Sequence, residues 1–344
     1  MERLGRRKFL KLATISSLAA LAPGPRIDFR PRTTLTPTLP EITIAQISGL
    51  HETPVGDGSL DLDLAFSHFK RWGIRHTTVI NPTGRWLAAA RVANMPFVAR
   101  LHDENHNNLF DIDTFEKFAE PLEDYQGNVI VQLFNEITNP KETKGRKISV
   151  SEHTKQHIIP AGEATLNANL VPSIPPFDQT RNGLFEFRQT LEVIKAQKGP
   201  EWIRNNWVIT AHNYTFAPGQ YIWQDLLIMA GIMQDVLGGL LKIHVTEAGP
   251  NSLFYEIYGE RAFVDETRKT LVEPVHYKLN SLIDSYDMWV YANGAQRLKQ
   301  PDDPEGEQEM KKFEQTAYIG VDENGEIYEK PVAIAAARIK AHLQ

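Results

Sequence analysis

The sequence contains no cysteine among its 344 residues. Without thiols the chain cannot form disulfides, cysteine-ligated zinc sites or iron–sulfur clusters, and it cannot use a thiol nucleophile. Positive charge is also in short supply, because 37 Lys and Arg stand against 43 Asp and Glu and give a net charge of −6. We therefore expect a neutral substrate and no nucleic-acid partner.

A glycine-rich phosphate-binding turn is missing as well. Gly56-Asp57-Gly58 follows the first apolar run, but the third glycine and the helix start required by that motif are absent. This argues against a doubly wound open sheet that binds a dinucleotide, and we expect no cofactor. The hydrophobic content of 42% is nevertheless high enough for one large α/β domain with a substantial core.

The N-terminal segment resembles a twin-arginine export signal. Arg6-Arg7-Lys8-Phe9-Leu10-Lys11 precedes the weakly apolar run 12–22, which is too short for a stable transmembrane anchor. Residues 1–22 are interpreted as a signal peptide and the Pro- and Thr-rich residues 23–40 as a linker. The resemblance implies export by the twin-arginine machinery to the periplasm, cell envelope or exterior; the alternative is a frayed basic terminus followed by a short helix.

From Glu41 onward, short apolar β-branched runs alternate with longer amphipathic stretches. This alternation is typical of repeated βα units around a parallel sheet. Eight such units in about 300 residues predict a (β/α)₈ TIM barrel formed by a single catalytic domain, residues 41–344. The eight predicted strands are Ile42–Ile47, Arg75–Ile80, Phe97–Leu101, Val129–Phe134, Ala168–Ile174, Trp207–Ala211, Leu241–Val245 and Met288–Tyr291.

Helical stripes are visible between several of these strands. Apolar residues fall on one helical face in 62–69 before Gly73, and again in 184–194 before Gly199. Pro160 interrupts the stretch 141–167, which predicts a short or distorted helix there.

Two carboxylates follow strands on opposite sides of the predicted barrel. Glu136 comes after the strand 129–134, and Glu247 comes after the strand 241–245. Catalytic groups of such barrels lie at the C-terminal ends of the strands, so the two side chains are expected to converge across the mouth. Paired carboxylates of this kind hydrolyse glycosidic bonds, one as proton donor and the other as nucleophile.

These motifs resemble those of the clan A glycoside hydrolases, a cellulase-like superfamily of retaining (β/α)₈ enzymes. Asn135-Glu136 matches the strand-four Asn-Glu, which implies Glu136 as acid/base; Thr246-Glu247-Ala248-Gly249 matches the strand-seven motif, which implies Glu247 as nucleophile. Asn135 would bind the substrate 2-hydroxyl group. The family often has Pro after Asn-Glu, whereas this chain has Ile137, so the subfamily is left open.

Two further matches support the resemblance. His212-Asn213-Tyr214 at the sixth strand is similar to the family's His-x-Tyr, whose tyrosine contacts the nucleophile. Trp289, expected on the eighth strand, resembles its sugar-stacking tryptophan. The hairpin 319–325 and Lys330-Pro331 resemble the segment that precedes the last helix.

The polar stretch 101–108 permits another interpretation. Its His and carboxylate residues could hold a metal ion in a metal-dependent barrel hydrolase, but the spacing does not match a zinc-protease motif. We expect His102 instead to line the sugar-binding cleft, with no metal. A carbohydrate-binding barrel without activity is a further alternative. For the retaining mechanism we expect the two carboxyl groups roughly 5 Å apart and the pKa of Glu136 raised.

Overall fold

The fold is seen in a computed structural model. The structure describes residues 48–52, 62–102, 108–123, 125, 129–137, 139, 148–178, 180–218, 223–276, 282–288, 317–321, 327–335 and 338. The expected signal peptide and linker, residues 1–40, lie outside the described residues. No helix in the described part of the chain is both long and apolar enough to cross a membrane.

Eight parallel strands form a closed barrel in which each strand pairs with the next along the chain and the eighth pairs with the first. The predicted (β/α)₈ architecture is therefore confirmed, and the open-sheet alternative is excluded. The strands are β1 Ser48–Glu52, β2 His76–Ile80, β3 Phe97–Arg100, β4 Ile130–Gln132, β5 Val171–Ile174, β6 Val208–Thr215, β7 Ile243–Pro250 and β8 Ile283–Met288.

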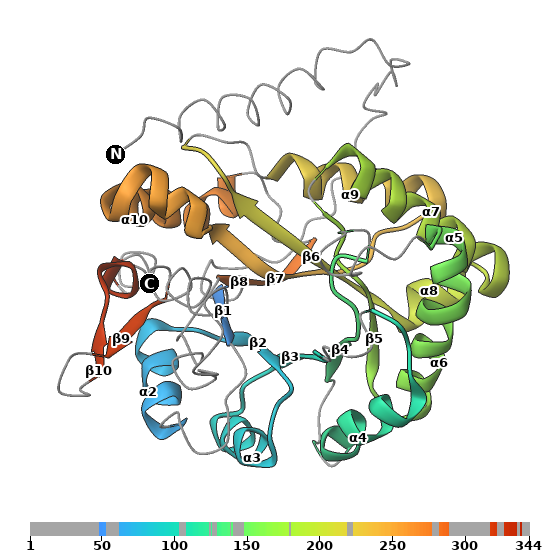
Figure 1. Ribbon diagram of the computed structural model, residues 1–344, viewed down its shortest axis with the longest axis horizontal. Coiled ribbons are helices and arrows are strands. Elements are labelled where there is room, and N and C mark those ends of the chain that lie inside the picture. The colour runs from blue at the N-terminus through green and yellow to red at the C-terminus, as the bar shows by residue number, and fades with distance from the viewer. Residues whose placement is uncertain are drawn as a thin grey trace, which may run out of the picture. The chain divides into compact units, whose positions relative to one another are not determined.

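The helices surround the outside of the strands (Figure 1). Helix α2 ends just before Gly73, whose φ of 70° suits glycine. Helix α7 begins after Thr180, whose hydroxyl accepts a hydrogen bond from the N–H of Gly183. The helices are α2 Leu62–Trp72, α3 Gly84–Ala93, α4 Ile112–Glu123, α5 Val150–His153, α6 Ile159–Asn167, α7 Arg181–Lys198, α8 Pro200–Asn206, α9 Trp223–Leu237 and α10 Ser252–His276.

The expected distortion in 141–167 is present where that stretch is described. A π-helical turn, η2 (Thr154–Ile158), joins α5 to α6, and Pro160 lies in the first turn of α6, where a missing N–H costs little. A separate antiparallel hairpin, β9 (Ile319–Val321) and β10 (Ile327–Glu329), precedes Lys330. Glu329 binds Arg71 and accepts a hydrogen bond of 2.8 Å from the indole of Trp72, so the hairpin is attached to α2.

The first and the eighth predicted strands have other bounds than β1 and β8 of the structure. The expected start of the eighth strand at Met288 is wrong, because β8 begins at Ile283, and residues 289–291 of that prediction lie outside the described residues. The expected first strand, Ile42–Ile47, lies outside the described residues, and the strand that closes the barrel there is β1.

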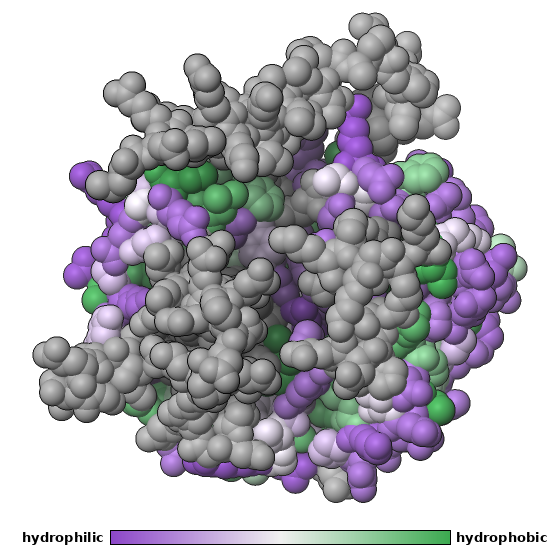
Figure 2. Space-filling model, viewed as in Figure 1, coloured by the Kyte–Doolittle hydropathy of each residue, from purple (hydrophilic) through white to green (hydrophobic). Residues whose placement is uncertain are grey.

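Apolar side chains between the barrel and its helices form one continuous core, with the largest residues fully buried. The outward surface of the helices at the right of Figure 2 is mostly hydrophilic, with scattered hydrophobic residues. Hydrophilic residues are also visible deep in the middle of this face (Figure 2). The interior of the barrel is indeed partly polar, since Thr78, Ser173, Thr210, Ser285 and Asp287 are all buried.

The packing of α6 on the barrel predicts a stability difference between two glycine substitutions. In Gly162→Ala the new Cβ would lie 1.9 Å from the ring of Trp207, so overpacking should lower the free energy of unfolding by about 1–3 kcal/mol. Gly84→Ala is the control, since nothing lies within 4 Å of its Cβ. Urea unfolding of both variants measures this, and equal stabilities would contradict the packing described.

Candidate active site

The site is built at the carboxyl ends of four strands. Arg100 is the last residue of β3, Glu136 follows β4, His212 and Tyr214 lie on β6, and Glu247 lies on β7. These five side chains come together at one end of the barrel through the hydrogen bonds and ion pairs described below. The structure therefore brings together four of the predicted residues and adds Arg100, which sequence reasoning missed.

A bulge in β7 aims Glu247 at this cluster. Ala211 of β6 pairs with Val245, but the next residue, His212, pairs with Glu247, so Thr246 is the extra residue. Side chains alternate along a strand, and one inserted residue moves every later side chain to the other face. Without the bulge, Glu247 would not share a face with His212.

Gly249 makes this part of β7 possible. Its φ is 93°, a conformation that side chains rarely adopt, and a Cβ there would lie 2.4 Å from Cε of Met288 on β8. Glycine is thus required by the backbone conformation, whereas the side chain of Met288 could move away from a Cβ.

Glu247 is buried, with 6% of its surface exposed, and is surrounded by donors. Arg100 forms an ion pair with Oε1, and the hydroxyl of Tyr214 donates to Oε2. Burial and the nearby carboxylates raise the pKa of Tyr214 well above its usual range, so the hydroxyl keeps its proton and can donate. Hydrogen bonds to the charged form stabilise a carboxylate, so this arrangement favours ionised Glu247.

Glu136 is held by two donors. Nδ1 of His212 lies 2.8 Å from Oε1, and the side-chain amide of Asn139 donates to Oε2 at 2.6 Å. Burial alone would raise the pKa of Glu136, but the hydrogen bonds from His212 and Asn139 and the charge of His212 lower it below the usual range. The expectation of a raised pKa for Glu136 is therefore wrong, because it rests on the role of proton donor and does not include the donors His212 and Asn139.

His212 connects the two glutamates. Its other ring nitrogen, Nε2, lies 3.6 Å from Oε1 of Glu247, and its side chain is only 1% exposed. Burial would lower the pKa of His212, but the charges of Glu247 and Glu136 and the bond to Glu136 raise it. Within the described part of the chain, only Nδ1 is hydrogen-bonded to a carboxylate, whereas Nε2 lies near Glu247 without a hydrogen bond, so the electrostatic surroundings rather than two hydrogen bonds favour the imidazolium form. The distance of roughly 5 Å expected between the carboxyl groups stays a prediction.

The remaining predicted residues are less closely involved. Asn135 is half-buried beside Glu136, and among the described residues its Oδ1 has no hydrogen-bond partner. His102 follows β3 with an exposed side chain. Trp289 and the stretch 103–107 lie outside the described residues, so neither sugar stacking by Trp289 nor the metal alternative is tested. No group of potential metal ligands is found in the part of the chain that the structure describes.

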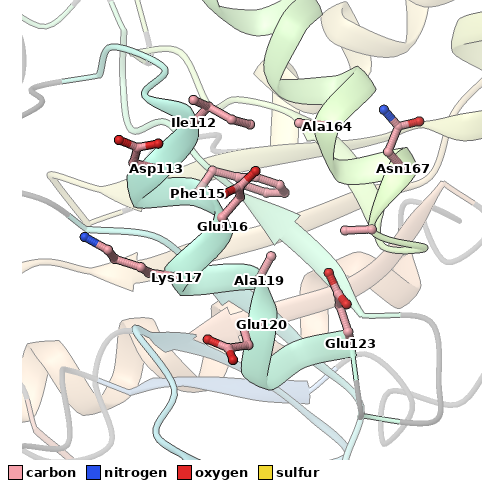
Figure 3. A pocket seen from close by; sticks show the side chains of 11 residues that line it. Ile112, Asp113, Phe115, Glu116, Lys117, Ala119, Glu120, Glu123, Ala164 and Asn167 are labelled. Atoms are coloured by element: carbon pink, nitrogen blue, oxygen red, sulfur yellow. The ribbon is translucent and has the colours of Figure 1, made fainter.

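A separate groove lies on the outside of the barrel between α4 and α6 (Figure 3). It encloses about 720 Å³ and has an acidic lining that shares no residue with the cluster around His212. Its charged side chains are Asp113, Glu116, Lys117, Glu120 and Glu123. Because it lacks the opposed charges and bridging hydrogen bonds of the barrel end, we assign the candidate active site to the barrel.

Comparisons with known proteins identify the fold. No protein-family model matches the sequence, and no curated protein matches it. Among solved structures, CJP38, a β-1,3-glucanase and allergen of Cryptomeria japonica pollen, is 12% identical, with a TM-score of 0.52 over 82% of this chain and 97% of that chain. AbfB, a family 51 α-L-arabinofuranosidase from Bifidobacterium longum, is 10% identical, with a TM-score of 0.54 over 86% and 72%.

Saccharomyces cerevisiae Gas2p, in complex with laminaritetraose and laminaripentaose, is 10% identical, with a TM-score of 0.51. The match covers 86% of this chain and 63% of that chain, less than two thirds of its length. At these identities the likeness concerns the fold alone. This chain thus has a barrel of the kind found in glycoside hydrolases.

The contacts of His212 predict how the pKa of Glu136 responds to substitution. His212→Gln removes the positive charge that favours ionised Glu136, while burial remains, so the pKa of Glu136 should rise. Titration of ¹³C-labelled carboxyl groups by NMR measures it, with the Glu136 signal assigned from a Glu136→Gln variant. His68→Gln, which changes a buried histidine stacked on Trp72 in α2, should leave the titration unchanged. An unchanged pKa in His212→Gln would show that His212 does not control this carboxyl group.

Proposed function

We propose that the protein is a retaining glycoside hydrolase in which Glu247 is the nucleophile and Glu136 the acid/base. The observation that carries this proposal is that Glu136 and Glu247, at the ends of β4 and β7, each lie against a different nitrogen of the His212 ring. A double displacement needs two carboxyl groups close enough to reach opposite sides of one anomeric centre, and an inverting enzyme needs room for a water between them.

The environments of the glutamates divide the two roles. Arg100 and Tyr214 orient the carboxylate of Glu247 and favour its charged form, as attack on the anomeric carbon requires. No arginine is paired with Glu136 among the described residues, and Glu136 is bound instead by His212, whose raised pKa favours the imidazolium form. The proton needed by the leaving oxygen is therefore carried by His212, and it must move from Nδ1 to Oε1 of Glu136 before Glu136 can donate it. In the second half-reaction Glu136 takes a proton from water.

The proposed substrate is an oligo- or polysaccharide with β-linkages. Asn135 would bind the 2-hydroxyl group, and the unsatisfied Oδ1 of its buried amide supplies an acceptor. Trp289 would stack on a sugar ring, and His102 would line the cleft. β-1,3-Glucan is the first polymer to test, because CJP38 is a β-1,3-glucanase and Gas2p was solved with laminari-oligosaccharides. An inactive carbohydrate-binding barrel and a metal-dependent hydrolase that uses His102 are the alternatives.

A substrate screen and two variants test this function. Laminarin, mixed β-glucan, xylan, mannan and aryl glycosides are offered to the wild type, with and without a chelator, and NMR follows the anomeric configuration of the first product. We expect retention and no effect of chelation. Inversion would reject the double displacement, and inhibition by the chelator would favour the metal-dependent alternative.

Glu247→Ala should abolish hydrolysis, because no glycosyl-enzyme can form. Glu136→Ala should lower kcat by about 10²–10⁴-fold on substrates with poor leaving groups, and less on activated aryl glycosides. Azide, which needs no general base, should restore turnover of Glu136→Ala on an aryl β-glycoside and give the β-glycosyl azide. Rescue of Glu247→Ala with inverted product, but not of Glu136→Ala, would count against Glu136 as acid/base.

We also infer that the chain is exported through the twin-arginine machinery. The support is the sequence of residues 6–11 and the short apolar run after it. Replacing Arg6 and Arg7 together by Lys should leave the protein in the cytoplasm of a bacterial host, as cell fractionation would detect. Unchanged export would contradict the signal, while removal of a chaperone of the general secretory route should have no effect.

A further inference from the structure

Side-chain amides, rather than the strand ladder, hold the backbone that carries Glu136. The ladder of β4 ends at Gln132, which pairs with Arg100 of β3. Beyond it, the carboxamide of Gln132 donates to the carbonyl of Phe134 at 3.2 Å, and the carboxamide of Asn108 binds Asn135. The chain leading to Glu136 is therefore fixed by contacts that secondary structure does not supply.

Asn108 binds both backbone groups of Asn135. Its Oδ1 accepts from the N–H of Asn135 at 2.7 Å, and its Nδ2 donates to the carbonyl of Asn135 at 2.5 Å. A carboxamide offers one acceptor and one donor side by side, as a peptide group does, so Asn108 extends the ladder after β4 has ended. We call this pair of hydrogen bonds the Asn108 clamp.

The residue after the clamp has an unusual backbone. Glu136 has a φ of 37°, in a region that residues other than glycine rarely adopt and that persists only where surrounding contacts hold it. The N–H of Asn139 donates to the carbonyl of Glu136 at 2.7 Å and closes the turn from the other side. Glu136 is thus fixed between the Asn108 clamp before it and Asn139 after it.

The same device occurs once more at this end of the barrel. Asn81, after β2, donates to the carbonyl of His102 at 2.8 Å and accepts from its N–H at 3.0 Å. Both asparagines have positive φ, 44° for Asn81 and 61° for Asn108. Asn81 therefore fixes the backbone that follows β3, and Asn108 fixes the backbone that follows β4.

Asn108 is itself anchored to the distorted helix. Nε2 of His153, the last residue of α5, donates to the carbonyl of Asn108 at 2.6 Å, and Nδ1 of His157 in η2 accepts from the N–H of Phe110 at 3.1 Å. The two rings lie 5.0 Å apart. The end of α5 and the π-helical turn after it thus each present one histidine to the segment 108–110, and π turns are frequent at functional sites.

We propose that Asn108 is a positioning residue for Glu136. By binding both backbone groups of Asn135, it holds the left-handed turn that places the carboxyl group of Glu136 between His212 and Asn139. Its side-chain hydrogen bonds go to the backbone of Asn135 and not to either glutamate carboxyl group. The kinetic consequence rests on the proposed function, whereas the effect on the position of Glu136 does not.

Asn108→Gly removes the clamp without straining the positive φ. It should lower kcat on the order of 10²-fold with little change in KM, because a shift of about 1 Å in a catalytic group has that cost. Asn94→Gly is the matched control. Asn94 is the C-cap of α3, has a φ of 50° and an exposed side chain, and precedes the N-terminal end of β3, which is the end opposite the site. The control should match the wild type, and equal kcat values for Asn108→Gly and the wild type would overturn the proposal.

Asn108→Asp supplies a signature that general loosening of the structure would not produce. A protonated carboxyl group can donate and accept as the amide does, whereas the carboxylate only accepts. The kcat ratio of Asn108→Asp to Asn108→Gly should therefore increase as the pH falls. Among the described residues, the titratable groups near Asn108 include His153, His157 and Glu136, and they are common to both variants. If Asn108→Gly does not fold, Asn108→Asp is compared with the wild type, and a ratio independent of pH rejects the clamp.

NMR titration of Glu136 separates this proposal from the proposed function. Asn108→Gly should raise the pKa of Glu136, because the carboxyl group leaves the donors that lower it, and Asn94→Gly should not. If Asn108→Gly raises the pKa of Glu136 but the wild type cleaves no glycoside, the role of the Asn108 clamp is supported and the proposed glycosidase function is rejected. An unchanged pKa would reject the clamp, whatever the activity.

Discussion

Two carboxylates can be buried beside one another in this barrel only because positive charge is buried with them. An ion removed from water without a partner costs several kcal/mol, and two like charges add repulsion. Arg100 is paired with Glu247, and His212 lies between Glu247 and Glu136. The cluster therefore sets two carboxyl groups against an arginine and a histidine whose pKa is raised by those carboxylates, and protonation of His212 balances its charges. Removing any one of the four would leave an uncompensated charge in a buried site.

The same constraint extends down the barrel interior. Asp287 is fully buried on β8 and is bound by His76 at 3.1 Å and by the hydroxyl of Thr78 at 2.5 Å. His244 lies beside His76, and burial followed by the charge of His76 lowers its pKa to about 3, so it is neutral and bonded to Ser285 at 3.0 Å. Because His244 is neutral and hydrogen-bonded, it adds no uncompensated charge to the polar interior.

The polarity of the interior also explains which parts of the fold could be predicted. β3 begins with the apolar run Phe-Val-Ala, and β2 and β7 contain β-branched aliphatic residues, so the prediction found these three strands. β8 has the sequence Ile-Asp-Ser-Tyr-Asp-Met, in which Ser285 and Asp287 are buried polar residues, so a search for apolar runs placed the strand too late. β1 has one aliphatic residue in five and is established by its pairing with β2 and β8. Barrel closure, a long-range property, recovers strands that local hydrophobicity does not reveal.

At the candidate site, the sequence could predict the positions of the two glutamates in the fold but not their protonation states. Glu136 and Glu247 each follow a segment predicted as a strand, and this order is visible in the sequence. Arg100 left a signal too, as a charged residue that ends the apolar run Phe-Val-Ala. No sequence pattern indicates the charge state of Glu136. It depends on His212, which is 76 residues away, and on Asn139, whose amide faces Glu136 across a turn in which Glu136 has positive φ. Burial and hydrogen bonding shift the pKa of a carboxyl group in opposite directions, and their balance depends on distances of about 3 Å between distant segments. A sequence therefore indicates where an acid emerges from a barrel, whereas the folded backbone decides whether it holds a proton.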